Sequence, residues 1–258
     1  MTKIKQAVLT AVGILIPFLG TALGASAVFF VKKELSEKTQ KAFLGFASGV
    51  MLAASVWSLL IPAMEHQREL GGIHWLPAVA GFLAGNLAMV GLDILCTNFT
   101  KNRGKDHSPD IMLTLAVTLH NLPEGMAVGV VWASVSDFSL PALSGALMLS
   151  LGIAVQNLPE GAIISAPLCA SGTKKSRAFA LGAASGIVEP LGAGLTLALT
   201  SVMRPILPYV LSFAAGTMVY VVFEELSPEM QKGKKSFCGV LGMAVGFGLM
   251  MLLDAALG

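Results

Sequence analysis

The sequence predicts an all-α polytopic membrane protein with eight transmembrane helices in an inverted 3+2+3 repeat. Of the 258 residues, 55% are hydrophobic and only 12% are charged, whereas a soluble domain carries roughly twice this share of charge. The apolar residues form runs of about 20 residues, which is long enough to cross a bilayer. This pattern excludes a soluble domain and a disordered chain, and a net charge of +2 is too small to indicate nucleic acid as a partner.

Short breaks rich in Gly, Pro, Lys and Ser separate the eight runs, so we expect a single transmembrane domain over residues 1–258. The three cysteines lie far apart and indicate no disulfide framework. The predicted spans are residues 7–31, 42–63, 76–99, 111–134, 141–168, 178–201, 207–226 and 238–257.

The first run has an alternative interpretation as a signal peptide. Lys3 and Lys5 precede it, and Ala25-Ser26-Ala27 resembles a cleavage site. Its similarity to a later run, described below, favours a place in the mature fold instead.

The distribution of basic residues predicts the orientation of the chain. Thirteen of the 17 Lys and Arg residues fall in four loops that eight spans would place on one side of the membrane. The positive-inside rule assigns that side to the cytoplasm, so both termini are expected outside it. The four loops are residues 32–41, 100–110, 169–177 and 227–237.

The spans at the two ends of the chain resemble each other. Gly13–Pro17 resembles Gly186–Pro190, and Phe46–Met51 resembles Phe213–Met218. Gly81, Gly85, Leu92 and Asp93 match Gly242, Gly246, Leu253 and Asp254 at one offset of 161 residues. Spans 1–3 are therefore predicted to repeat as spans 6–8 in the opposite orientation, around a central hairpin at 111–168. Inverted repeats are typical of transporters, whose sites lie where the repeats meet.

Two related hexapeptides lie in the middle of the fourth and fifth spans. His120-Asn121-Leu122-Pro123-Glu124-Gly125 and Gln156-Asn157-Leu158-Pro159-Glu160-Gly161 share five of six positions. They lie at similar distances from the turn at 135–140, so an antiparallel pair places them at the same depth. We expect them to face each other across one site.

The spacing within each hexapeptide suits metal coordination. His120 and Glu124 are four residues apart and share a helix face, as do Gln156 and Glu160. Each Pro also leaves a backbone carbonyl free four residues earlier, at Leu119 and at Val155 in turn. Such a mixture of nitrogen and oxygen donors fits a divalent first-row metal. The predicted ligands from the two motifs are His120, Asn121, Glu124, Gln156, Asn157 and Glu160.

Acidic residues occur inside several spans, but no Lys or Arg lies well inside any of them. A buried charge costs about 2.5–3.5 kcal/mol on insertion scales, so a bound cation or a proton must offset these acids. Glu189 stands where the match to the first span has Ile16, which indicates a specific task such as a further metal ligand. A protonated Glu189 packed between helices is the alternative.

These motifs resemble those of the ZIP (Zrt/Irt-like) family of divalent metal transporters, closest to its bacterial branches. The resemblance covers all eight spans and the paired motifs. It implies a metal site, sometimes binuclear with the two motif glutamates bridging, and a further ligand at Glu189. It also implies an elevator-like slide. The first position of the second motif is often His in the family and is Gln156 here. Many members also have His-Glu in span 7, where this chain has Glu224-Glu225, so an inner His is missing.

The expected function is uptake of zinc into the cytoplasm across a bacterial inner membrane by alternating access. Iron, manganese, cobalt and cadmium are further candidate substrates, a homodimer is a candidate assembly, and no enzyme activity, organic cofactor or nucleic-acid partner is expected. An intramembrane metalloprotease is disfavoured because no HExxH motif is present. A proton-coupled small-solute carrier that uses the acids as proton relays is the remaining alternative.

Overall fold

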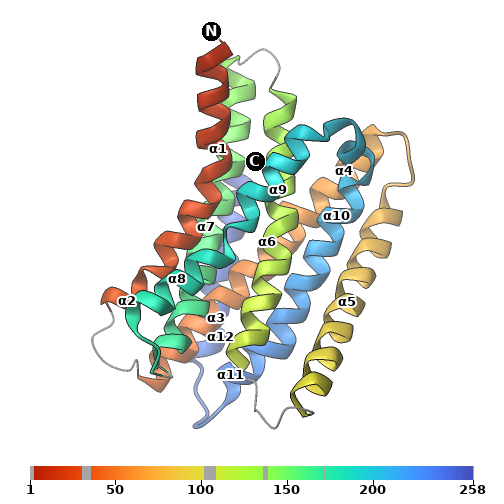
Figure 1. Cartoon of the computed structure of the whole chain (residues 1–258). Coiled ribbons are helices and arrows are strands. Elements are labelled where there is room, and N and C mark those ends of the chain that lie inside the picture. Colours follow the sequence, from red (N-terminus) through yellow and green to blue (C-terminus); the bar gives the residue numbers. More distant parts are fainter. Residues whose placement is uncertain (1–2, 31–35, 102–108, 136–138, 171, 258) are drawn as a thin grey trace.

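The computed structural model describes residues 3–30, 36–101, 109–135, 139–170 and 172–257, and every regular element in these ranges is a helix (Figure 1). Two of the helices, η1 and η2, are short π-helical segments. The elements are α1 (Lys3–Ala25), α2 (Ala27–Phe30), α3 (Glu37–Ala54), η1 (Ser55–Leu60), α4 (Ile61–Glu69), α5 (Trp75–Lys101), α6 (Pro109–Ser134), α7 (Leu140–Ala170), α8 (Lys175–Ser185), α9 (Val188–Ala198), α10 (Thr200–Val221), η2 (Val222–Leu226), α11 (Ser227–Gln231) and α12 (Cys238–Leu257).

Helices cover all eight predicted runs, which confirms the all-α polytopic membrane class. In the described residues, six helical segments are long and apolar enough to cross a membrane, and shorter apolar stretches lie in α6 and α12. The number of eight crossings stays a prediction. Several runs differ from expectation. The first is interrupted at Ser26, between α1 and α2. The second continues through η1 and α4 to Glu69, and the sixth, predicted as 178–201, is broken between α8 and α9.

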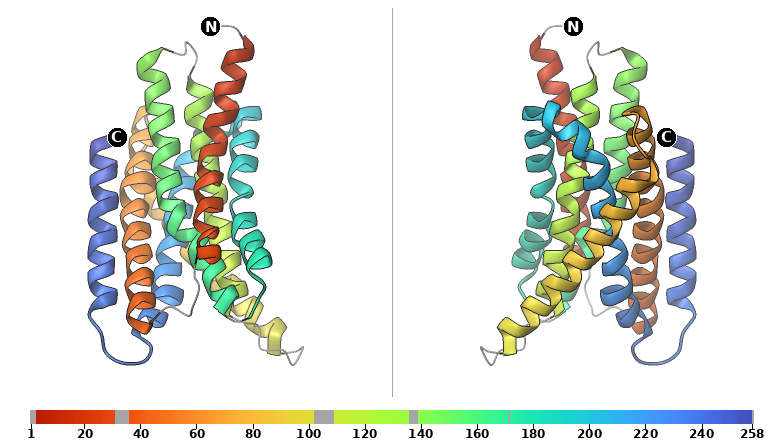
Figure 2. Two further views of the ribbon diagram at one scale, coloured as in Figure 1. Left: turned by 90° about the vertical axis from the view of Figure 1, so that its left-hand side faces the viewer. Right: turned by 90° about the vertical axis from the view of Figure 1, so that its right-hand side faces the viewer.

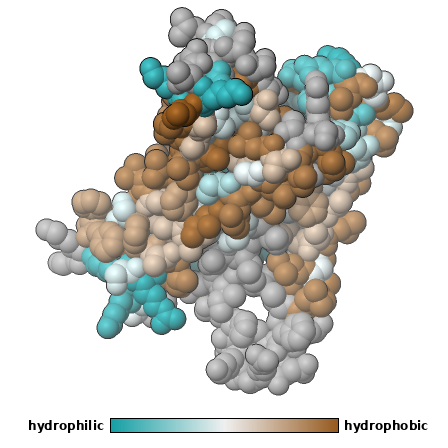
Figure 3. Space-filling model, turned by 45° about the horizontal axis from the view of Figure 1, so that its top comes forward, coloured by the Kyte–Doolittle hydropathy of each residue, from teal (hydrophilic) through white to brown (hydrophobic). Residues whose placement is uncertain are grey.

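The surface between the two ends of the molecule is apolar. In Figure 3 most of the coloured side chains between the two ends are hydrophobic, and the strongly hydrophilic ones gather at the ends. Along α1, the exposed residues Val8, Val12, Leu15, Leu19 and Leu23 recur every three or four positions and form one stripe. Exposed apolar stripes of this length are stable against lipid and unstable in water. This surface agrees with a membrane-embedded bundle.

The long helices form two groups. In one group α3 packs along α12 and α5 along α10, and in the other α1 packs along α7 and α6 along α9 (Figures 1 and 2). The two groups meet mainly where α10 contacts α6. A large apolar core around Met51 and Met218 fills the first group, and a smaller one around Trp132 lies between α6 and α7.

Close helix contacts recur at positions that the predicted repeat makes equivalent. A Cβ on Gly85 would lie 2.1 Å from the carbonyl oxygen of Phe213, and a Cβ on Gly246 would lie 2.0 Å from that of Phe46. Gly85 matches Gly246, and Phe213 matches Phe46. The α5–α10 and α3–α12 pairs therefore meet through the same small-residue contact, which supports two related three-span units.

The π-helical segments also lie at matching places. Ser55 begins η1 nine residues after Phe46, and Val222 begins η2 nine residues after Phe213. Pro62 and Pro228 follow at the start of α4 and α11. A proline lacks the N–H that an α-helix needs, so the regular hydrogen-bond pattern is interrupted within one residue of the same point in both units.

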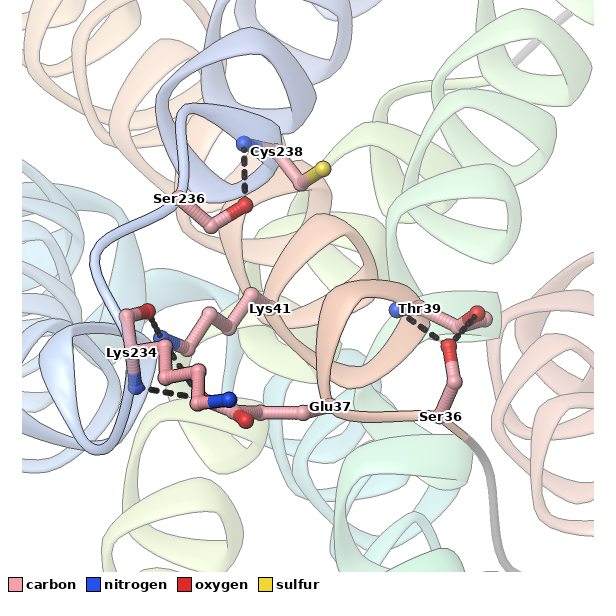
Figure 4. Close-up of polar contacts among 7 residues, drawn as sticks. All are labelled: Ser36, Glu37, Thr39, Lys41, Lys234, Ser236 and Cys238. Carbon is pink, nitrogen blue, oxygen red and sulfur yellow. Dashed lines mark hydrogen bonds and ion pairs between the residues drawn. The ribbon is translucent and has the colours of Figure 1, made fainter.

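A polar clasp joins the start of α3 to the loop before α12, as Figure 4 shows. Lys41 is buried, although the sequence placed it in a loop, and its Nζ lies 3.1 Å from Glu37 Oε1 and donates to the carbonyl oxygen of Lys234 at 2.5 Å. Glu37 Oε1 in turn accepts the backbone N–H of Lys234 at 2.8 Å. The carboxylate therefore balances a buried cation and holds the loop at the same time.

We expect Glu37→Gln to lower the unfolding temperature by a few degrees, because it removes the negative charge that faces the buried Lys41. Thermal unfolding of the purified protein measures the effect, with the exposed Lys38→Gln as the control on the same helix. Equal unfolding temperatures for Glu37→Gln and the unaltered protein would contradict a stabilising role for the clasp.

Candidate metal centre

The predicted ligands gather in the second helix group. The first hexapeptide lies in α6, the second in α7, and Glu189 lies in the first turn of α9. Six of the seven predicted ligands are no more than 1% exposed: Asn121, Glu124, Gln156, Asn157, Glu160 and Glu189. The side chain of His120 lies outside the described part of the structure, so its role stays a prediction.

The two hexapeptides meet directly. Gln156 Nε2 donates to Glu124 Oε1 at 2.6 Å, which joins α7 to α6. Glu160 and Glu189 are close enough to Glu124 for their charges to interact with it. Three acidic side chains from three helices therefore share one buried region.

Glu189 is held by donors from two other helices. Its Oε1 accepts from Thr21 Oγ1 at 2.8 Å and from Asn121 Nδ2 at 3.3 Å. Asn121 Nδ2 also lies 3.4 Å from the carbonyl oxygen of Ser185. In a continuous helix this carbonyl would accept the N–H of Glu189. At the break between α8 and α9 that N–H donates to the carbonyl oxygen of Gly186 instead. The break in the sixth span thus lies at the candidate site, as in transporters with discontinuous helices.

Thr21 is the contact that sequence reasoning missed. It is fully buried in α1 and reaches across to α9. The chain shows a second threonine in the same run, Thr10, and nothing in the sequence distinguishes the two.

Several buried oxygen atoms of this group accept no hydrogen bond from any residue that the structure describes. A buried acceptor without a donor costs about 1–3 kcal/mol, more when it is charged. A divalent cation would supply the missing positive charge, since carboxylate and amide oxygens are among its usual ligands. The atoms are Asn121 Oδ1, Glu124 Oε2, Gln156 Oε1, Asn157 Oδ1 and Glu189 Oε2.

Carboxylates alone do not complete a site. Among the described side chains, no group of three His, Cys, Asp or Glu residues lies close enough together to hold a metal ion. The donors at hand are therefore mixed, with the amides of Asn121, Gln156 and Asn157 beside the carboxylates.

The final glycine of each hexapeptide allows close helix contact at the site. A Cβ on Gly125 would lie 2.1 Å from the carbonyl oxygen of Glu189, and a Cβ on Gly161 would lie 2.0 Å from that of Thr21. Both neighbours are backbone atoms, which cannot turn aside as a flexible side chain can. The Pro-Glu-Gly pattern thus combines an acid with the contact that packs it against the next helix.

These contacts correct the predicted register between the first and sixth spans. The predicted match placed Ile16 opposite Glu189. Because Gly125 and Gly161 are equivalent, their neighbours Glu189 and Thr21 are equivalent as well. In this register Leu23-Gly24-Ala25 aligns with Leu191-Gly192-Ala193, which is an identical triplet. The predicted match rested on the shared Gly-Ile and Pro residues. In the structure Gly13 lies against Trp132 and Gly186 lies against Thr21, so these glycines do not make equivalent contacts.

The remaining candidates lie apart from this group. Asp93 and Glu224 interact electrostatically with Glu225 near η2. His66 Nδ1 lies 3.8 Å from Glu69 Oε2 in α4. The side chain of Asp254 lies outside the described part of the structure, and no metal role is assigned to any of these residues.

Comparison with known proteins identifies the relatives of the chain. The sequence model described as ZIP Zinc transporter matches residues 109–254. Zinc transporter ZIPB of Bordetella bronchiseptica is 37% identical over 93% of this chain and 79% of its own length. Zinc transporter GufA of Myxococcus xanthus is 36% identical over 93% of this chain and 96% of its own. Zinc transporter ZIP11 of Homo sapiens is 32% identical, with 92% and 94% covered.

Proposed function

Since the chain belongs to the ZIP zinc transporter family, we propose that it takes up zinc through the buried group between α6, α7 and α9. The family, which is a transporter family, and the apolar helices make the chain a multi-pass membrane transporter of divalent metal cations, with zinc as the main substrate. The proposal adds the site, the direction and the mechanism. Its ligands are His120, Asn121, Glu124, Gln156, Asn157, Glu160 and Glu189.

The observation that carries the proposal is the set of buried oxygens that accept no hydrogen bond from the described part of the chain. Glu124 Oε2 and Glu189 Oε2 come from different helices. The other oxygen of each carboxylate, Oε1, already accepts a hydrogen bond, from Gln156 in Glu124 and from Thr21 in Glu189. Each carboxylate therefore keeps one oxygen for the ion. A neutral substrate would need donors as well as acceptors, whereas a cation needs acceptors only.

The two helix groups support alternating access. The ligands all lie in the group that contains α1, α6, α7 and α9, while α3, α5, α10 and α12 hold none of them. Movement of one group against the other would carry the site as a unit past a fixed partner. The groups meet mainly at α10 and α6, and contact at so few elements suits such a shift.

The proposal also covers the orientation of the chain in the membrane. α1 begins and α12 ends toward the same end of the bundle, and α11 lies at the other (Figures 1 and 2). With the Lys-rich loops in the cytoplasm, both termini lie outside it in a bacterial inner membrane. We also propose a homodimer and transport of iron, manganese, cobalt or cadmium at the same site.

We expect cadmium, a heavier and larger mimic of zinc, to bind beside Glu124 and Glu160 at mid-depth. Anomalous scattering from crystals grown with cadmium locates the ion, and zinc should raise the unfolding temperature in a concentration-dependent way. Magnesium is the control, because it prefers rigid octahedral sites with several waters. Metal found only in the loops, or equal stabilisation by magnesium, would contradict the proposed site.

Transport itself is tested by uptake of radioactive zinc into proteoliposomes. Uptake should saturate with rising zinc concentration, whether or not an imposed proton gradient accelerates it. Absence of zinc uptake under every imposed pH and voltage gradient would contradict metal transport and favour the solute carrier.

A further inference from the structure

We infer that Thr21 is a positioning residue of the transport site, which orients Glu189 so that one carboxylate oxygen faces the metal. The inference deepens the proposed function and rests on it. Thr21 contributes no ligand. Its hydroxyl holds the oxygen of Glu189 that does not bind, and thereby determines where the other oxygen points.

The geometry separates the two oxygens of Glu189. Oε1 accepts from Thr21 Oγ1 at 2.8 Å and, at the longer distance of 3.3 Å, from Asn121 Nδ2. Oε2 is buried and accepts from none of the residues that the structure describes. With Oε1 fixed by a short hydrogen bond, the carboxylate cannot rotate freely, and only Oε2 remains for a cation.

The hydroxyl of Thr21 behaves differently from other buried hydroxyls of this fold. Ser55 and Thr217 donate to backbone carbonyls four and three residues earlier, at Met51 and Ala214. That is the usual choice of a Ser or Thr inside a helix. Thr21 instead donates to a carboxylate 168 residues away. A hydrogen bond within its own helix therefore does not account for the hydroxyl of Thr21.

Gly186 provides the space for this contact. A Cβ at Gly186 would lie 2.9 Å from Thr21 Oγ1 and 3.0 Å from Glu189 Oε1. The hydrogen bond thus passes over a residue without a side chain, at the point where the sixth span is broken. The carboxylate of Glu189 is therefore surrounded by the break before α9, by Gly186 and by the hydroxyl of Thr21.

Thr21 and Glu189 also occupy equivalent places in the two repeats. Each lies with its carbonyl oxygen against the final glycine of a hexapeptide, Thr21 at Gly161 and Glu189 at Gly125. One repeat therefore supplies the ligand and the other supplies the residue that orients it. Both lie in the same helix group, so the hydrogen bond is retained when the two groups shift.

The test compares Thr21→Val, which keeps the shape and removes the hydroxyl, with Thr21→Ser, which keeps the hydroxyl. Loss of a group that orients a metal ligand typically costs about 10- to 100-fold in metal affinity. We expect zinc affinity, measured by calorimetry on the purified full-length protein, to fall by about that factor in Thr21→Val and to recover in Thr21→Ser. Thr217→Val, at a buried threonine outside the site, should bind zinc normally.

A double-mutant cycle separates positioning from a general packing effect. In a Glu189→Gln background, Thr21→Val should cause little further loss, because the carboxylate on which it acts is gone. Equal further losses in both backgrounds would overturn the inference, as would normal affinity in Thr21→Val. If Thr21→Val is too unstable for calorimetry, Thr21→Ala is compared with Thr21→Ser in the same cycle.

The outcomes distinguish this inference from the proposed function. Normal zinc affinity in Glu189→Gln would refute Glu189 as a ligand and with it the role of Thr21, and normal affinity in Glu124→Gln and Glu160→Gln as well would refute the proposed site. Weak affinity in Glu189→Gln combined with normal affinity in Thr21→Val would leave the site intact and refute only the role of Thr21.

Discussion

Glu124→Gln and Glu160→Gln should each lower zinc uptake by about 100-fold or more, because loss of a ligand should cost at least as much as the 10- to 100-fold loss seen for groups around it. Both side chains are buried, at 0% and 1% exposure, in a region that holds several acceptors and no Lys or Arg. Glutamine keeps the size of the side chain and removes its charge. The protein should therefore fold while its affinity for a divalent cation falls.

Uptake of radioactive zinc into proteoliposomes measures this effect, and unfolding temperature in the absence of zinc shows whether the variants fold. Glu69→Gln is the matched control, since Glu69 is an exposed carboxylate at the end of α4. Gln156 can keep a hydrogen bond to an amide at position 124, which limits the damage to packing. Either variant carrying zinc at the normal rate would refute the role of that glutamate.

Gly161→Ala should destabilise the protein by about 3 kcal/mol or more, at the upper end of the effects of overpacking. The added methyl group would lie 2.0 Å from the carbonyl oxygen of Thr21, so α1 and α7 must move apart. That movement would also displace Thr21 from Glu189. The same change therefore lowers both stability and zinc affinity.

Gly152→Ala is the matched control on the same helix. A Cβ at Gly152 meets no other atom within 4 Å, and alanine is a better helix former than glycine by about 1 kcal/mol. The control should be as stable as the original protein or slightly more so. Thermal unfolding in detergent compares the two variants, and equal stability would show that α1 and α7 tolerate separation at Gly161.

Local patterns in the sequence were enough to predict the class of fold and most of the polar side chains that the structure gathers between α6, α7 and α9. The length of the apolar runs specified membrane helices, because burial of the backbone in lipid requires helical hydrogen bonding. The five shared positions of the two hexapeptides predicted that Glu124 and Glu160 share a site. In the structure these two side chains lie close enough to interact electrostatically. Both predictions depend on spacing along a single helix or hairpin, which sequence alone records.

Local patterns in the sequence did not predict the contacts between segments that are far apart in the chain. The register between the first and sixth spans was predicted from Gly13–Pro17, whereas packing pairs Thr21 with Glu189 through the glycines of the hexapeptides. Lys41 was expected in a loop because it is charged, yet Glu37 and Lys234 give it partners in a buried position. Glu189 lies in a helix far from Thr21 along the chain, and Lys234 lies in a loop far from Lys41. Only Glu37, four residues from Lys41 on α3, is a partner that a local pattern could have identified.

The sequence by itself determined an all-helical membrane protein with acids at the middle of its fourth and fifth spans, since hydrophobic length and charge spacing are properties of the chain alone. Only the tertiary structure decided which oxygen of Glu189 is held and which remains free, where the sixth span breaks, and that Thr21 rather than Thr10 reaches the site. The physical reason is that small, mostly apolar residues fit many helix registers about equally well. Close backbone contacts at a few glycines select one of them.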